Sequence, residues 1–124
     1  MSSPSGIPVL VMGLKSGGSF SEEDIKKATA AQARLAVEAG FAPVPCILDP
    51  AADDAANVAT VREQIKKTPF KIVAIGGGVR GDLARTPLFE QLVNICIEEI
   101  KPTPRLVFPS SPDDAVAALK RGFA

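Results

Sequence analysis

Residues 70–80 read Phe-Lys-Ile-Val-Ala-Ile-Gly-Gly-Gly-Val-Arg, an apolar segment followed by three glycines. It contains an unbroken apolar run from Ile72 to Ile75, which is typical of a parallel strand covered on both faces. Glycines follow at once, and we expect a glycine-rich loop over Gly76–Arg85. A strand buried on both faces needs helices on both sides of its sheet, so the stretch predicts an α/β protein.

The rest of the chain alternates between strand and helix patterns around this run. Each helix has a starting signal, such as Ser21 followed by three acids, or Thr86 followed by proline. In the first helix, we expect Ile25, Ala28, Leu35, Ala36 and Ala39 to form the buried face. The expected strands are Ile7–Gly13, Ala42–Leu48, Phe70–Ile75 and Leu106–Phe108, and the expected helices begin at Ser21, Asp53, Thr86 and Ser111.

Two prolines indicate the order of the strands. Pro43 and Pro45 are two residues apart, so their missing N–H groups fall on the same side of the second strand, which places that strand at an edge. Right-handed crossovers then favour a four-stranded parallel sheet of order 2-1-3-4. The predicted architecture is a three-layer, flavodoxin-like or Rossmann-like domain over residues 7–124, preceded by a flexible tail at 1–6.

Composition narrows the classes of partner. Fourteen basic and fourteen acidic residues cancel, and Trp and Tyr are absent, so neither a basic field nor stacking platforms favour nucleic acid. The first apolar run is interrupted by Pro8 and is too short to cross a bilayer. Cys46 and Cys96 fit two buried thiols in a reducing compartment. We therefore expect a cytoplasmic protein with no membrane contact.

A ligand site is expected where the strand order reverses, between the first and third strands, because parallel sheets bind ligands at the carboxyl ends of such strands. The two glycine-rich segments, 15–19 and 76–81, meet there. The third helix also lacks acids in its first turn and follows two arginines, which favours an anion. The alternative is that the glycines only form turns and the arginines only face solvent. Expected ligand-binding residues are Gly17, Gly18, Ser19, Gly76, Gly77, Gly78, Arg80, Arg85, Ser110 and Ser111.

The residue types present limit any catalysis. Without histidine, Ser-His-Asp and Cys-His chemistry and histidine metal sites are impossible. Asp49 and Asp82 are the candidate general bases, and Lys15 and Arg80 could stabilise developing negative charge. The alternatives are a turn for Asp49 and a helix cap for Ser111. No metal is expected, because histidine is absent and the spacing of the two cysteines does not suit a metal site. No cofactor is expected either, because the glycine motifs miss both the dinucleotide and the phosphate-loop patterns.

The second half of the chain resembles a group of short, largely uncharacterised α/β proteins of bacteria and fungi. The resemblance rests on Val73-Ala-Ile-Gly-Gly-Gly-Val-Arg80, Leu88-Phe89-Glu90, Asn94 and Ser111-Pro112-Asp113, which fit the pattern IGxGVR…LFExxxN…SPxD. It implies a fold and a motif but no reaction. It also draws attention to Arg80, Glu90 and Asn94.

Two hypotheses of different classes follow. The first is a domain that binds a small anionic molecule, a carboxylate or a phosphate; whether it also performs cofactor-independent acid–base chemistry stays open. The second is a non-catalytic interaction or regulatory module. We also expect a homodimer through the broad apolar surface of the third helix, unless the second helix covers that surface. The residues expected at the dimer contact are Phe89, Val93, Ile97 and Ile100.

Overall fold

The computed structural model describes residues 6–15 and 21–123, in which four parallel strands form a single sheet of order β2-β1-β3-β4. The strands are β1 (Ile7–Leu14), β2 (Phe41–Leu48), β3 (Ile72–Ile75) and β4 (Arg105–Val107). The helices are α1 (Glu22–Glu38), α2 (Asp54–Lys67), α3 (Gly77–Arg80), α4 (Thr86–Glu99) and α5 (Ala115–Phe123), with 3-10 turns η1 (Leu83–Arg85) and η2 (Pro112–Asp114). The expected α/β fold and strand order are confirmed.

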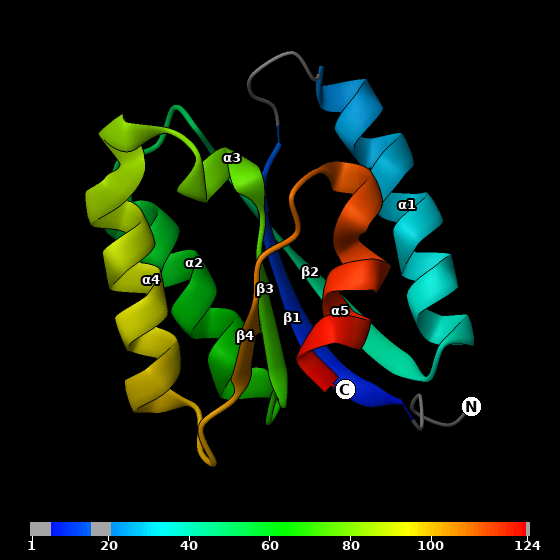
Figure 1. Ribbon diagram of the computed structural model, residues 1–124. Coiled ribbons are helices and arrows are strands. Elements are labelled where there is room, and N and C mark those ends of the chain that lie inside the picture. The colour runs from blue at the N-terminus through cyan, green and yellow to red at the C-terminus, as the bar shows by residue number, and fades with distance from the viewer. Residues whose placement is uncertain (1–5, 16–20, 124) are drawn as a thin grey trace.

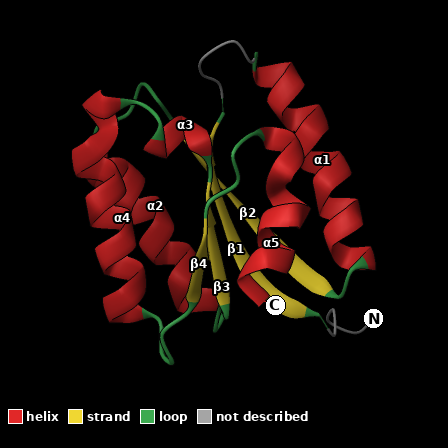
Figure 2. Cartoon of the chain, in the orientation of Figure 1, coloured by secondary structure: helices red, strands yellow, loops and turns green. Residues whose placement is uncertain are grey.

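Helices cover both faces of the sheet, α2 and α4 on one side and α1 and α5 on the other (Figure 1; Figure 2). Successive residues of a strand point to opposite faces, so β1 contributes to two cores. Leu10 and Met12 pack on the α2–α4 side, whereas Val9 and Val11 pack on the α1–α5 side. The four residues of β3 are at most 1% exposed, as the unbroken apolar run predicts.

Local signals set the helix ends. Ser21 and Asp24 form a capping box at the start of α1, and the Asp53 side chain accepts the Ala56 N–H at the start of α2. Gly40 follows α1 with a φ of 97°, a left-handed conformation that favours glycine. These three signals were readable in the sequence, and the structure confirms them.

The segment after β3 differs from the prediction. Instead of a loop over Gly76–Arg85, it forms the single turn of α3 and then η1. Thr86 is not the cap of α4: it is the first residue of that helix, and its N–H donates to the Leu83 carbonyl of η1. The preceding 3-10 turn therefore performs the capping that the Thr-Pro pair was expected to perform.

The backbone nitrogens of the two prolines of β2 face the outer edge of the sheet. The Ile7 N–H at the start of β1 donates to the Gly40 carbonyl, and the Lys15 N–H just after β1 donates to the Leu48 carbonyl. Even-numbered positions of β2 therefore face β1, and odd-numbered positions face away. Pro43 and Pro45 are therefore on the outer side, where no neighbouring strand needs their N–H. The expected edge position of this strand is confirmed.

Most of the apolar surface of α4 is used within the chain. Ile100 is 3% exposed, and Phe89 and Val93 are partly buried against the core that α4 shares with α2 and the sheet. Of the four residues expected at a dimer contact, Ile97 is the most exposed, at 39%. The homodimer stays a prediction, and this packing leaves it less apolar surface than the sequence suggested.

No helix in the described part of the chain is both long enough and apolar enough to cross a membrane.

Candidate functional site

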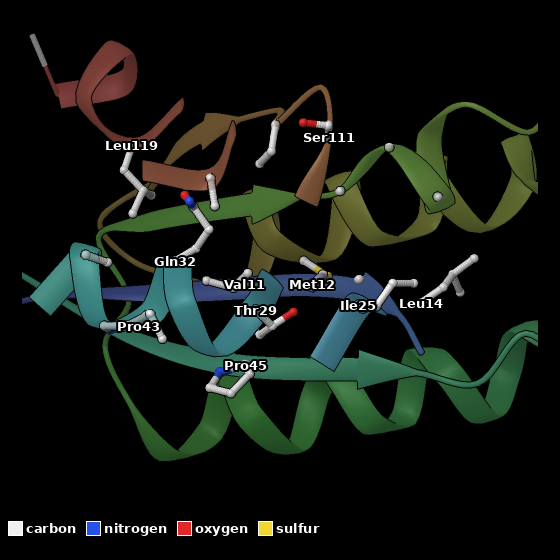
Figure 3. Close-up of a pocket in the computed structure, with 18 of the residues that line it drawn as sticks. Val11, Met12, Leu14, Ile25, Thr29, Gln32, Pro43, Pro45, Ser111 and Leu119 are labelled. Carbon is white, nitrogen blue, oxygen red and sulfur yellow. The ribbon is translucent and has the colours of Figure 1, made fainter. Parts of the chain in front are cut away.

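A cavity of about 280 Å³ lies between the sheet and the two helices α1 and α5 (Figure 3). It extends to the carboxyl ends of β1 and β3, where the strand order reverses and where the sequence places a ligand site. Its described lining is mainly apolar. The lining residues are Val11, Met12, Gly13, Leu14, Ile25, Thr29, Gln32, Ala33, Ala36, Pro43, Pro45, Gly76, Gly77, Gly78, Pro109, Ser110, Ser111, Ala115 and Leu119.

The cavity exists because α1 turns small and polar side chains toward the sheet. Thr29, Gln32 and Ala33 line it, together with Ile25 and Ala36. The expected inward face was partly wrong. Leu35 is 47% exposed and Ala39 is exposed as well, so the helix is rotated away from its large apolar residue. Small side chains at these positions cannot fill the space above the sheet.

Gly13 widens the cavity from the sheet side. It follows Val11 by two residues on β1, so its side-chain position points to the α1–α5 face. A Cβ atom built there would have no described atom within 4 Å. Nothing in the described packing requires a glycine at this position, and the missing side chain leaves the cavity open. The sequence places Gly13 at the end of a strand and at the start of an incomplete phosphate-loop pattern, and neither position predicts a role in a cavity wall.

Gly76, Gly77 and Gly78 border the cavity, as the sequence predicts for this loop. Gly76 donates its N–H to the Met12 carbonyl at 2.9 Å, and a Cβ there would lie 3.3 Å from that oxygen. Close approach of β3 to β1 therefore accounts for the first glycine. The expected residues Gly17, Gly18 and Ser19 lie outside the described residues.

Three side-chain groups with polar atoms in the lining have no hydrogen-bond partner among the described residues. They are the Thr29 hydroxyl, the Ser111 hydroxyl and the Nε2 amide of Gln32, whose Oε1 accepts the Val116 N–H at 2.9 Å. The Ser110 hydroxyl differs, because it donates to Asp114 Oδ2 at 3.1 Å. Thr29 and Gln32 were missed from the sequence, where they count as polar positions of an amphipathic helix.

None of the charged candidate residues is in the described lining of the cavity. Lys15 forms a salt bridge to Asp49, with 3.7 Å between Lys15 Nζ and Asp49 Oδ1, and both side chains are nearly half exposed. Asp49 also forms a turn, its Oδ1 accepting the Ala51 N–H. The side-chain amide of the buried Asn57 holds the Asp49 backbone, because its Oδ1 accepts the Asp49 N–H and its Nδ2 donates to the Asp49 carbonyl. These contacts give Asp49 the turn role that the sequence left as an alternative.

The two arginines expected to bind an anion have partners within the chain. Arg80 donates from its terminal nitrogen to the Pro109 carbonyl at 2.6 Å and lies over the Phe108 ring at 5.7 Å. Its Nε is buried with no partner among the described atoms. Arg85 Nε lies 3.7 Å from Asp82 Oδ2. Asp82 also caps η1, because its Oδ1 accepts the Ala84 N–H.

Glu90 and Asn94, which the motif emphasises, are both exposed on α4, and neither lines the cavity. Cys46 and Cys96 are buried in the α2–α4 core, where burial raises their pKa values to about 11 and about 12. Both thiols are therefore protonated at neutral pH and are poor nucleophiles. Within the described residues, no three cysteine or acidic side chains come together as a metal site.

Asp114 holds the segment that carries Ser110 and Ser111. Its pKa lies below the ordinary aspartate value, first because the carboxylate accepts the Ser110 backbone N–H at 2.9 Å, and also because it bonds Arg121. A lowered folded-state pKa means that the charged form stabilises the fold above the ordinary value, and that this stabilisation disappears as pH falls through the folded-state pKa.

We expect wild type to unfold at higher urea concentration than Asp114→Asn at pH 7, with the gap closing as the pH falls below about 4. Urea titrations across this range measure the gap. Asp113→Asn is the matched control, because Asp113 is exposed and has no hydrogen bond among the described residues. A gap that does not change with pH would contradict the assigned role.

Comparisons with protein-family models, with curated proteins and with solved structures gave no match to this chain.

Proposed function

We propose that this chain binds a small carboxylate-bearing molecule with an apolar body in the cavity between α1, α5 and the sheet. One observation carries the proposal: a mainly apolar cavity, which reaches the carboxyl ends of β1 and β3, has in its lining three polar groups with no partner among the described residues. Mostly apolar walls with a few convergent polar groups are typical of small-molecule sites.

The size of the cavity limits the ligand. Its volume of about 280 Å³ is near the lower end of the usual range for such sites, about 300 Å³. At about 30 Å³ for each water in the liquid, it equals the volume of about nine waters. A molecule of roughly that number of non-hydrogen atoms fits, which favours a single ring or a short chain with one head group.

The described lining favours a carboxylate over a phosphate. No lysine or arginine is among the described lining residues, so a phosphate dianion would be buried there without a counter-charge. A carboxylate carries one charge and can be held by hydrogen-bond donors. The described lining also contains no carboxylate or lysine that could act as a general acid or base, so we propose binding without assigning a reaction.

Cyclohexanecarboxylate tests the proposal, because it has an apolar ring, a carboxylate and about nine non-hydrogen atoms. We expect it to raise the thermal unfolding temperature with a saturable dependence on concentration. Calorimetric titration gives the affinity, and acetate is the control for the charge alone. Acetate should have a much weaker effect because it leaves the apolar walls unfilled.

The interaction module remains the alternative function. It gains support if neither cyclohexanecarboxylate nor a wider panel of small carboxylates stabilises the chain, while a defined partner protein is recovered and binds to purified chain. That outcome would contradict the proposed small-molecule site.

A further inference from the structure

We infer that Gln32 on α1 determines which head group the site accepts, with Thr29 as a second contact. The site would thus select a ligand with a hydrogen-bond acceptor, such as a carboxylate, over an amine. This inference rests on the proposed function and goes beyond it by naming the residues that discriminate. It starts from the one contact that Gln32 makes across the gap between α1 and α5.

The contact with α5 fixes the orientation of the Gln32 amide. Val116 is the second residue of α5, and its N–H is one of the helix-start donors that need a partner outside the helix. Only the oxygen of a glutamine amide can accept such a bond, so Oε1 must face α5. The Nε2 group is thereby also fixed, and it has no partner among the described residues.

This arrangement makes Nε2 the group that sets the head-group preference. A hydroxyl can donate or accept, so Thr29 and Ser111 would tolerate either kind of head group. The Nε2 group only donates, and Gln32 cannot flip without breaking the bond to Val116. An ammonium placed beside it would meet a like partial charge and an unmatched donor, whereas a carboxylate oxygen would accept from it.

Thr29 lies next to Gln32 in the lining. The two residues are three positions apart on α1, so they share one face of the helix, and both line the cavity (Figure 3). The Thr29 hydroxyl has no bond among the described residues, whereas the Thr60 hydroxyl on α2 bonds the Ala56 carbonyl one turn earlier. The Thr29 hydroxyl is therefore available to a ligand bound in the same cavity.

Substitution of Gln32 by glutamate separates the two roles of the side chain. Glutamate keeps an oxygen for the Val116 N–H but replaces the donor with a second acceptor and a negative charge. The probes are cyclohexanecarboxylate and cyclohexylmethylamine, which share one apolar ring. We expect wild type to bind the carboxylate about tenfold or more tighter than the amine, and Gln32→Glu to reverse this order.

Further variants keep the test independent of how Gln32→Glu folds. Thr29→Val removes the hydroxyl at nearly constant volume, and we expect it to weaken carboxylate binding by about threefold to tenfold, with Thr29→Ser restoring it. Gln64→Glu makes the same charge change on α2, on the opposite side of the sheet from the cavity, and should leave the preference unchanged. Urea unfolding confirms that each variant is folded.

The outcomes separate the inference from the proposed function. Probes that bind wild type without preference, or a preference unchanged by Gln32→Glu and by Thr29→Val, would overturn the inference and leave the cavity as a binding site. Failure of wild type to bind both probes would overturn the inference and the proposed function together.

Discussion

A chain with Gly13 replaced by valine is expected to lose binding of cyclohexanecarboxylate while becoming harder to unfold. The new side chain would point into the cavity, where no described atom lies within 4 Å of its Cβ. Its two methyl groups would fill part of a volume of only about 280 Å³. Glycine inside a strand costs about 0.5–1 kcal/mol relative to alanine, so the substitution should raise the free energy of unfolding by about that amount.

Calorimetric titration and urea unfolding on the same protein preparation measure both effects. Gly13→Ala is the graded control: it should gain most of the stability and lose only part of the affinity, because a methyl group occupies little of the cavity. We expect the loss of affinity in Gly13→Val to exceed tenfold. Unchanged affinity in a folded Gly13→Val chain would show that the ligand binds elsewhere.

Replacement of Gly122 by valine is expected to cause the largest loss of stability among these variants. Gly122 lies on α5, and a Cβ atom built there would overlap the Cγ1 atom of Val107, which is 6% exposed on β4. Either the buried Val107 side chain or the helix itself would have to shift to accept the larger residue. Overpacking of this kind costs about 1–3 kcal/mol. Because α5 forms one wall of the cavity, the variant should also bind the carboxylate probe more weakly.

Two further variants isolate the cause of that loss. Ala117→Val makes a similar change at an exposed position of α5 and should cost no more than the helix propensity of valine, about 0.7 kcal/mol at most. Adding Val107→Ala to Gly122→Val should recover part of the stability, because it removes the overlapping atom. If Gly122→Val and Ala117→Val lose equal stability in urea, close packing against β4 is not the reason for the glycine.

The sequence predicted the sheet well because the relevant signals act locally. The unbroken run of β3 needs cover on both faces, and the prolines of β2 permit only an edge position. The rotation of α1 was not predictable in this way. Leu35 and Ala36 are adjacent in the chain, and the apolar pattern does not determine which of the two faces the sheet. In the structure, Ala36 is buried against the sheet and Leu35 is exposed.

The position of the cavity was predictable from topology, but most of the side chains that line it were not. Gly76 to Gly78, Ser110 and Ser111 border the cavity as expected, whereas Arg80, Asp82 and Arg85 have partners within the chain. In sequence, a charged residue near a glycine loop suggests a ligand role. The partner of Arg80, the Pro109 carbonyl, is 29 residues away in the chain, so the bond between them is not predictable from the local pattern. Thr29 and Gln32 gave only a weak signal. Polar residues three apart on a helix usually indicate its solvent-facing side.

Pro43 and Pro45 have backbone nitrogens that face the outer edge of β2, and this arrangement protects the edge against aggregation. A strand that paired with β2 along this edge would lack hydrogen-bond donors opposite Pro43 and Pro45, because proline has no N–H. It would therefore lose part of its hydrogen-bond ladder. Amyloid-like stacking and exchange of strands between molecules are both disfavoured there. A peptide partner that binds by adding a strand would meet the same obstacle, so recognition at this side of the molecule would have to use side chains.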